Sequence, residues 1–184
     1  GPGVEAWLEH ELPGLERSGA RVVVSIWGRG VEEYRRAAQM MAHAPASVVA
    51  VEVNLSCPNL EGRRGIFAHD PGLSAEVMSA TAAVGRPRWA KLSPNTDRVV
   101  EVAAAVHAAG AESVTLVNTL LGMVLDPQTG RPSLGAGGGG YSGAPVHPVA
   151  VRTVYDVRAA LPDLPIVGVG GVSSAWTAVE LLLA

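Results

Sequence analysis

The feature that most constrains the fold is a regular alternation of short β-branched runs with longer helical patterns. Runs with the composition of buried strands occur at residues 21–27, 48–54, 88–92, 113–117 and 165–170. Helical periodicity separates them at residues 31–44, 73–84, 96–110 and 146–161. Because strands that alternate with helices form parallel sheets, the sequence predicts an α/β fold.

The runs are apolar on both faces, which suits either an open doubly wound sheet or a (β/α)8 TIM barrel. Polar residues or glycines follow most of these runs, as in residues 54–59, 91–95, 117–119 and 168–171. This distribution favours the barrel, because an open sheet concentrates its site at one switch point. We therefore expect residues 1–184 to form a single barrel domain. With five predicted strands instead of eight, we expect it to be truncated at both ends.

Composition excludes several classes of protein. The chain is 48% hydrophobic and 17% charged, which indicates a globular domain, and its net charge of -3 gives no basic surface for nucleic acid. One cysteine permits no internal disulfide and suits a reducing cytoplasm. No apolar run approaches the ~20 residues of a membrane span. The five histidines show no metal-ligand spacing, so we expect no metal.

The segment NLSCPN places Asn54, Cys57 and Asn59 just past a predicted strand. An asparagine amide both donates and accepts hydrogen bonds, so two of them suit a planar ring with alternating carbonyl and N–H groups. Each is equally suited to a turn in which it bonds its own backbone. A lone cysteine often packs as a small hydrophobe, but the polar neighbours of Cys57 favour a chemical role.

Lys91 follows the apolar residues Trp89 and Ala90 within the predicted strand at residues 88–92. Its ammonium either meets an anion or acceptor inside the barrel, because burial of an unpaired charge is costly, or extends along its stem to solvent.

Two glycine-rich segments follow later strands. Residues 118–145 are too long for an ordinary loop, and DPQTG within them has the chemistry of a hairpin turn. The glycine run after it suits either a flexible linker or close approach of the backbone to a ligand. GVGG at residues 168–171, before Ser173 and Ser174, suits either an anion site at a helix start or a tight turn with serine caps.

Taken in order, NLSCPN, AKLSPN, VNTLLGM, GGYSG and GVGG resemble the dihydroorotate dehydrogenases, over essentially the whole chain. This resemblance implies a (β/α)8 barrel that binds FMN and oxidises dihydroorotate to orotate in pyrimidine biosynthesis. Cys57 matches the catalytic base of the soluble class 1 enzymes. The positions that match pyrimidine-binding residues are Asn54, Asn59, Asn118 and Thr119. Those that match FMN-binding residues are Asn54, Lys91, Val117, Gly143, Gly170 and Gly171.

The same resemblance implies partners. The AKLSPN and YSG segments are closer to the NAD-linked class 1B form, which pairs with an iron-sulfur and FAD subunit, so we expect a homodimer or heterotetramer. Ser25 departs from the asparagine that the family often carries at a flavin-contacting position. A dihydropyrimidine dehydrogenase-like flavin domain and a non-catalytic barrel fragment are the alternatives. A phosphate-binding isomerase or lyase would explain GVGG but leave NLSCPN unexplained.

Overall fold

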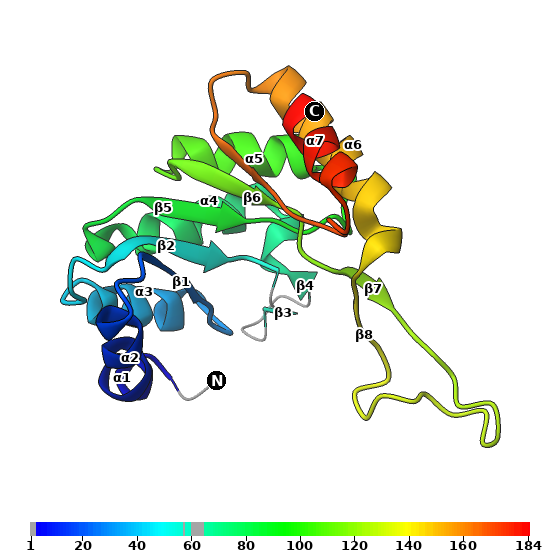
Figure 1. Ribbon diagram of the computed structural model, residues 1–184, viewed down its shortest axis with the longest axis horizontal. Coiled ribbons are helices and arrows are strands. Elements are labelled where there is room, and N and C mark those ends of the chain that lie inside the picture. The colour runs from blue at the N-terminus through cyan, green and yellow to red at the C-terminus, as the bar shows by residue number, and fades with distance from the viewer. Residues whose placement is uncertain (1–2, 57, 60–64) are drawn as a thin grey trace.

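The computed structural model describes residues 3–56, 58–59 and 65–184. A parallel five-stranded sheet runs through it in the order β1-β2-β5-β6-β9 (Figure 1). Its strands are β1 (Val22–Ile26), β2 (Val48–Asn54), β5 (Arg88–Lys91), β6 (Ser113–Leu116) and β9 (Ile166–Gly168). All five predicted strands are therefore present. The order never reverses along the sheet, as it would in a doubly wound fold, so the sheet is an arc of a (β/α)8 barrel.

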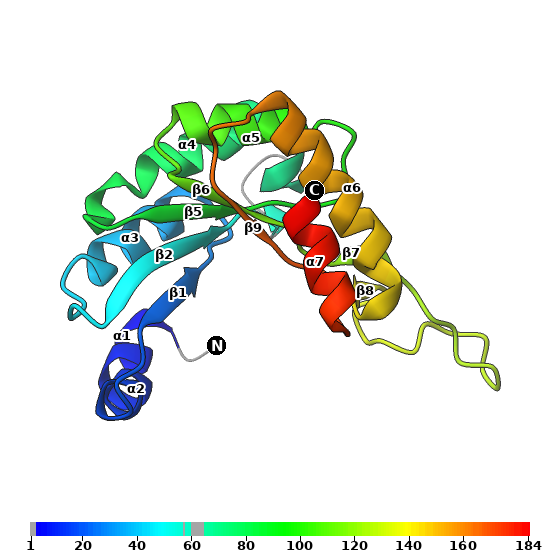
Figure 2. The ribbon, with the colours of Figure 1, turned by 45° about the horizontal axis from the view of Figure 1, so that its top comes forward.

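Helices follow the strands and line one face of this arc (Figure 2). They are α3 (Val31–Met41), α4 (Pro71–Ala80), α5 (Val99–Ala108), α6 (His147–Ala160) and α7 (Ala175–Leu183). Each of these helices contacts the next along the chain. Before β1, a helical segment combines α1 (Val4–Ala6), a π-helical turn (Trp7–Glu11) and α2 (Leu12–Arg17). Within the described ranges, no helix combines the length and apolarity that a membrane span needs.

The core lies between the sheet and the outer helices. Alternate side chains of each strand point into it, including the fully buried Val51, Val53 and Ala90. The ring of Tyr34 from α3 meets Phe67 edge-to-face with centroids 5.4 Å apart. The Tyr34 hydroxyl donates to the carbonyl of Asn54 at 2.6 Å. This bond ties the carboxyl end of β2 to the helical layer.

Two short hairpins extend from strand ends. In the first, β3 (Pro58–Asn59) pairs antiparallel with β4 (Gly65–Ile66). In the second, β7 (Leu120–Gly122) pairs antiparallel with β8 (Gly139–Tyr141), and the chain between them forms an arm that projects from the domain (Figure 1).

The arm confirms the hairpin predicted around DPQTG. A bridge joins Leu125 to Pro132, and the carboxylate of Asp126 accepts the backbone N–H groups of Gln128 and Thr129. Hydrogen bonds from Thr129, followed by that from Gln128, hold the pKa of Asp126 below its usual value. At the other end of the arm, a Cβ on Gly140 would lie 2.5 Å from the Thr119 hydroxyl. Contact within the chain thus accounts for glycine at that position.

Candidate active site

Glu52 lies at the centre of a polar cluster on the inner face of the sheet. Its carboxylate accepts hydrogen bonds from the hydroxyls of Ser25 at 3.0 Å and Thr115 at 2.9 Å. The Lys91 ammonium lies 3.8 Å from the same carboxylate, and 25% of the Lys91 side chain is exposed. The partner that an interior lysine requires is therefore an acid on the neighbouring strand.

Sequence reasoning missed Glu52, although a signal for it was present. It is the only charged residue in the apolar run VVAVEVN, and it stands two positions before Asn54. Because side chains two apart on a strand share a face, Glu52 and Asn54 both point inward. A charge on the inner face of a strand needs partners there.

Asn54 and Asn118 are bonded to each other across the sheet. Asn118 donates its amide N–H to the Asn54 side-chain oxygen at 3.0 Å, and that oxygen also accepts the backbone N–H of Ser56 at 3.1 Å. The Asn118 side-chain oxygen accepts the backbone N–H of Thr119 at 2.8 Å. The contact of Asn54 with Ser56 is the local turn contact that the sequence offered as an alternative role for this residue, and Asn118 makes a local contact of its own. Their mutual bond also joins two segments that are far apart in sequence.

Asn95, at the end of the AKLSPN segment, fixes the chain that follows Asn118. Its amide nitrogen donates to the carbonyl of Thr119 and its oxygen accepts the N–H of Leu121, at 2.9 and 2.8 Å. The polar strand ends of β5 and β6 therefore support one another. Sequence reasoning gave Asn95 no role of its own.

A pocket of about 370 Å³ opens at the carboxyl ends of β5, β6 and β9. It brings together seven of the predicted site residues, namely Lys91, Val117, Asn118, Thr119, Gly143, Gly170 and Gly171. Asn54 does not line it but bonds Asn118, which does. Cys57 lies outside the described residues, and of Asn59 the structure gives only its backbone pairing with Gly65. A larger cavity of about 500 Å³ lies along β1. Among the described residues, Ser25 is the one member of the polar inner-face cluster that lines it, and none of the predicted site residues does.

Glycines form the end of the pocket beside β9, which is the end farthest from β2 in the strand order. Gly143, Gly170 and Gly171 all have positive φ, at 89°, 143° and 64°. A Cβ on Gly170 would lie 2.7 Å from the Cβ of Ala150, and one on Gly171 would lie 2.7 Å from the carbonyl oxygen of Gly143. Packing within the chain therefore already requires glycine here. The loop that carries Gly143 and the loop that carries Gly170 and Gly171 therefore present backbone, without side chains, to the pocket.

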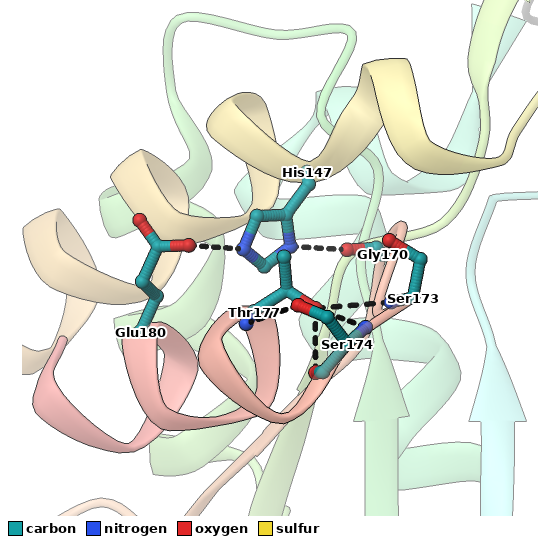
Figure 3. Close-up of polar contacts among 6 residues, drawn as sticks. All are labelled: His147, Gly170, Ser173, Ser174, Thr177 and Glu180. Atoms are coloured by element: carbon teal, nitrogen blue, oxygen red, sulfur yellow. Dashed lines mark hydrogen bonds and ion pairs between the residues drawn. The ribbon is translucent and has the colours of Figure 1, made fainter.

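The start of α7 confirms the predicted serine cap. Ser174 accepts the N–H of Thr177 at 3.2 Å, and the Thr177 hydroxyl accepts the N–H groups of Ser173 and Ser174, each at 3.0 Å (Figure 3). This reciprocal arrangement is a capping box. It fixes the chain immediately after the glycine turn. The cap and the anion site, which sequence analysis left as alternatives, are therefore compatible with each other.

Comparison with solved structures places the fold in a class. The chain matches the crystal structure of ligand-free type DHODH from Eimeria tenella with a TM-score of 0.61 and 17% sequence identity. The match covers 82% of this chain and 47% of that one. At this identity the likeness concerns the fold alone, which is that of an α/β barrel.

Comparison of sequences gives the family. The dihydroorotate dehydrogenase family model matches residues 1–184, so the chain belongs to the dihydroorotate dehydrogenase family, whose members are oxidoreductases. The catalytic subunit of dihydroorotate dehydrogenase B (NAD(+)) from Bacillus pumilus is 41% identical over 184 residues, as is that from Geobacillus kaustophilus. The chain spans 59% and 58% of their lengths, respectively.

Proposed function

We propose that this chain is part of an FMN-dependent dihydroorotate dehydrogenase that oxidises dihydroorotate to orotate. One observation carries the proposal. Seven residues that were selected from separate segments of the sequence line one pocket at the carboxyl ends of the strands. This edge is where barrels of this kind carry their active sites.

The residues of the pocket fit the two ends of FMN. At one end, the Lys91 ammonium suits the electron-rich edge of the flavin ring, and the Val117 backbone would line the ring. At the other end, Gly143, Gly170 and Gly171 offer backbone without side chains to the phosphate, beside the start of α7. When bound, FMN supplies the acceptor for the hydride that leaves the substrate.

The remaining residues act on the pyrimidine. Dihydroorotate becomes orotate by losing a proton from C5 and a hydride from C6, which leaves a C5–C6 double bond. The adjacent carbonyl acidifies the C5 proton, and Cys57 as thiolate would accept it. Asn54, Asn59, Asn118 and Thr119 would hold the ring by hydrogen bonds, so that both C–H bonds face their acceptors.

The environment of Lys91 adds a detail to this chemistry. Glu52 already forms an ion pair with Lys91, because the two charged groups lie 3.8 Å apart. The hydroxyls of Ser25 and Thr115 hold the Glu52 carboxylate in place. Lys91 is thus oriented before any ligand arrives, and its positive charge stabilises negative charge that develops on the ring.

The assembly belongs to the same proposal. The relatives from Bacillus and Geobacillus are named as catalytic subunits of an NAD(+)-linked enzyme. We therefore propose a homodimer or heterotetramer in which an iron-sulfur and FAD subunit carries electrons to NAD, located in the cytoplasm.

Anaerobic reduction of the flavin tests the function. The full-length gene product is purified, its flavin is identified by mass, and dihydroorotate, dihydrouracil or buffer is added while flavin absorbance is followed. Bleaching by dihydroorotate alone supports the proposal. Bleaching by dihydrouracil would instead favour a dihydropyrimidine dehydrogenase-like domain. Failure to bind FMN would favour a non-catalytic barrel.

A further inference from the structure

His147, the first residue of α6, lies between two hydrogen-bond acceptors. Its Nδ1 is 2.8 Å from the carbonyl oxygen of Gly170, and its Nε2 is 3.3 Å from a carboxylate oxygen of Glu180 on α7 (Figure 3). Only 7% of the residue is exposed. A ring that carries hydrogen on both nitrogens donates to both acceptors at once. The mechanism above uses neither His147 nor Glu180.

The contacts of His147 join the two glycine loops. It follows the short 3-10 helix Ala144–Val146, which begins just after Gly143. A Cβ on Gly171 would lie 2.9 Å from the Cβ of His147, so only glycine permits this approach. His147 therefore packs directly beneath the turn that we assign to the phosphate.

The bond to Gly170 determines where the next N–H points. A trans peptide unit is planar, and its C=O and N–H groups point in opposite directions. Because the Gly170 carbonyl points at His147, the N–H of Gly171 points away from the imidazole. Gly170 and Gly171 both line the pocket. Among residues 3–56, 58–59 and 65–184, no hydrogen-bond acceptor is assigned to the N–H of Gly171.

We propose that His147 is a positioning residue for the phosphate of FMN, which holds the Gly170–Gly171 peptide so that its N–H faces the phosphate. Glu180 fixes the orientation of the imidazole from the other side. The capping box of Ser174 and Thr177 holds the chain beyond the turn, so the peptide is constrained on both sides. This inference rests on the proposed function, because it assigns FMN to the pocket.

Two amide substitutions separate the bonds of His147. In His147→Asn the amide nitrogen occupies the δ position, like Nδ1, and still donates to Gly170. In His147→Gln it occupies the ε position, like Nε2, and reaches Glu180 instead. Both variants keep a polar side chain, so they differ in which acceptor they retain. His107 is the matched control, because its Nδ1 lies 3.0 Å from the Ala111 carbonyl and it does not line the pocket.

The readout is the affinity of the full-length gene product for FMN and for riboflavin, which lacks the phosphate, measured by flavin fluorescence. We expect His147→Gln to raise the Kd for FMN about tenfold, as loss of one hydrogen bond from a turn that binds an anion predicts. The Kd for riboflavin should stay the same. His147→Asn and His107→Gln should both retain the parent's affinity for FMN.

Three results would overturn the inference. In the first, His147→Gln binds FMN like the parent. In the second, it loses FMN and riboflavin equally, which means a general structural role. In the third, the parent binds no FMN, which removes the proposed function as well and so is distinguishable from the other two.

A measurement on the parent keeps the proposal testable if His147→Gln does not fold. FMN should shift the amide proton resonance of Gly171 downfield, and riboflavin should not. An unchanged Gly171 resonance in the presence of saturating FMN would overturn the inference.

Discussion

The two ends of the pocket are built in different ways. At the end that we propose for the flavin ring, called the ring end below, side chains bond one another: Asn118 donates to Asn54, and Lys91 pairs with Glu52. At the end that we propose for the phosphate, called the phosphate end below, backbone is held in place by the surrounding chain, through His147 and the close packing of Gly171. A ligand at the ring end therefore replaces contacts that the side chains already make with one another. A ligand at the phosphate end meets a backbone conformation that is already formed. Changes at the ring end should mainly affect chemistry, and changes at the phosphate end should mainly affect affinity.

The largest effect is expected from Cys57→Ala in the full-length gene product. Loss of a general base slows proton transfer by about 10²–10⁴, so flavin reduction by dihydroorotate should fall by at least ~10². FMN should remain bound, because the thiol has no proposed contact with the phosphate. Cys57→Ser should regain activity only at higher pH, since a hydroxyl is a weaker acid than a thiol. Anaerobic stopped-flow reduction measures this, and a Cys57→Ala variant that reduces its flavin at the parent's rate would assign the base elsewhere.

Lys91→Ala should have the second-largest effect on the rate of flavin reduction. Removal of one preorganised charge costs ~2.7–4 kcal/mol in the transition state, which corresponds to a reduction rate about 10²–10³ lower. It should also weaken FMN retention and leave the Glu52 carboxylate without its cation. Glu52→Gln is the matched variant, since it retains Lys91 while removing the competing anion, and it should raise the flavin reduction potential. An unchanged rate and an unchanged flavin content in Lys91→Ala would argue against its role.

Gly171→Ala tests the phosphate end. The left-handed conformation at φ 64° costs a residue with a Cβ about 1–2 kcal/mol, and that Cβ would lie 2.7 Å from the Gly143 carbonyl oxygen. The melting temperature should fall, and FMN should bind at least about tenfold more weakly, a change that 1.4 kcal/mol suffices to produce. Gly85→Ala is the control, because Gly85 also has positive φ, at 63°, but a Cβ there would meet no atom within 4 Å. It should lower stability without changing FMN affinity.

Asn118→Ala should act mainly on the substrate. It removes the bonds to Asn54 and to the Thr119 backbone, each worth about 0.5–1.5 kcal/mol. We expect KM for dihydroorotate to rise about tenfold while the Kd for FMN stays close to that of the parent. If FMN affinity falls as far as it does in Gly171→Ala, the division between the two ends of the pocket is wrong.

The smallest effect concerns the projecting arm, which belongs to neither end. The folded chain lowers the pKa of Asp126, so its contribution to stability is present above the usual value of 3.8 and is lost as the pH falls through the lower folded value. The protection of the Thr129 amide against exchange, measured relative to the intrinsic rate at the same pH, should therefore fall in acid, while flavin affinity, measured near neutral pH, is unaffected. Asp126→Asn retains an acceptor oxygen but does not titrate there. A protection that falls equally in this variant would exclude the carboxylate as the cause.

Sequence patterns predicted the strands well because each one is a local, mainly apolar run, and polar residues or glycines follow most of them. The hairpin at DPQTG was equally local, since Asp126 bonds residues two and three positions later. The helix expected at residues 73–84 instead begins at Pro71 and ends at Ala80, followed by a separate 3-10 turn at Ala82–Val84. Its start is set by Asp70, which accepts the N–H of Leu73 at 2.8 Å.

The sequence by itself determined the alternation of strands and helices, the barrel class and the set of polar strand ends, because periodicity and turn chemistry are properties of neighbouring residues. Resemblance to a family supplied the roles that we propose for Lys91 and Asn118. Only the tertiary structure decided that Glu52 is the partner of Lys91 and that His147 supports Gly170, because these pairs come from strands and helices that lie far apart along the chain. Their contacts depend on the register between parallel strands and on the packing of α6 against α7, which no local pattern encodes.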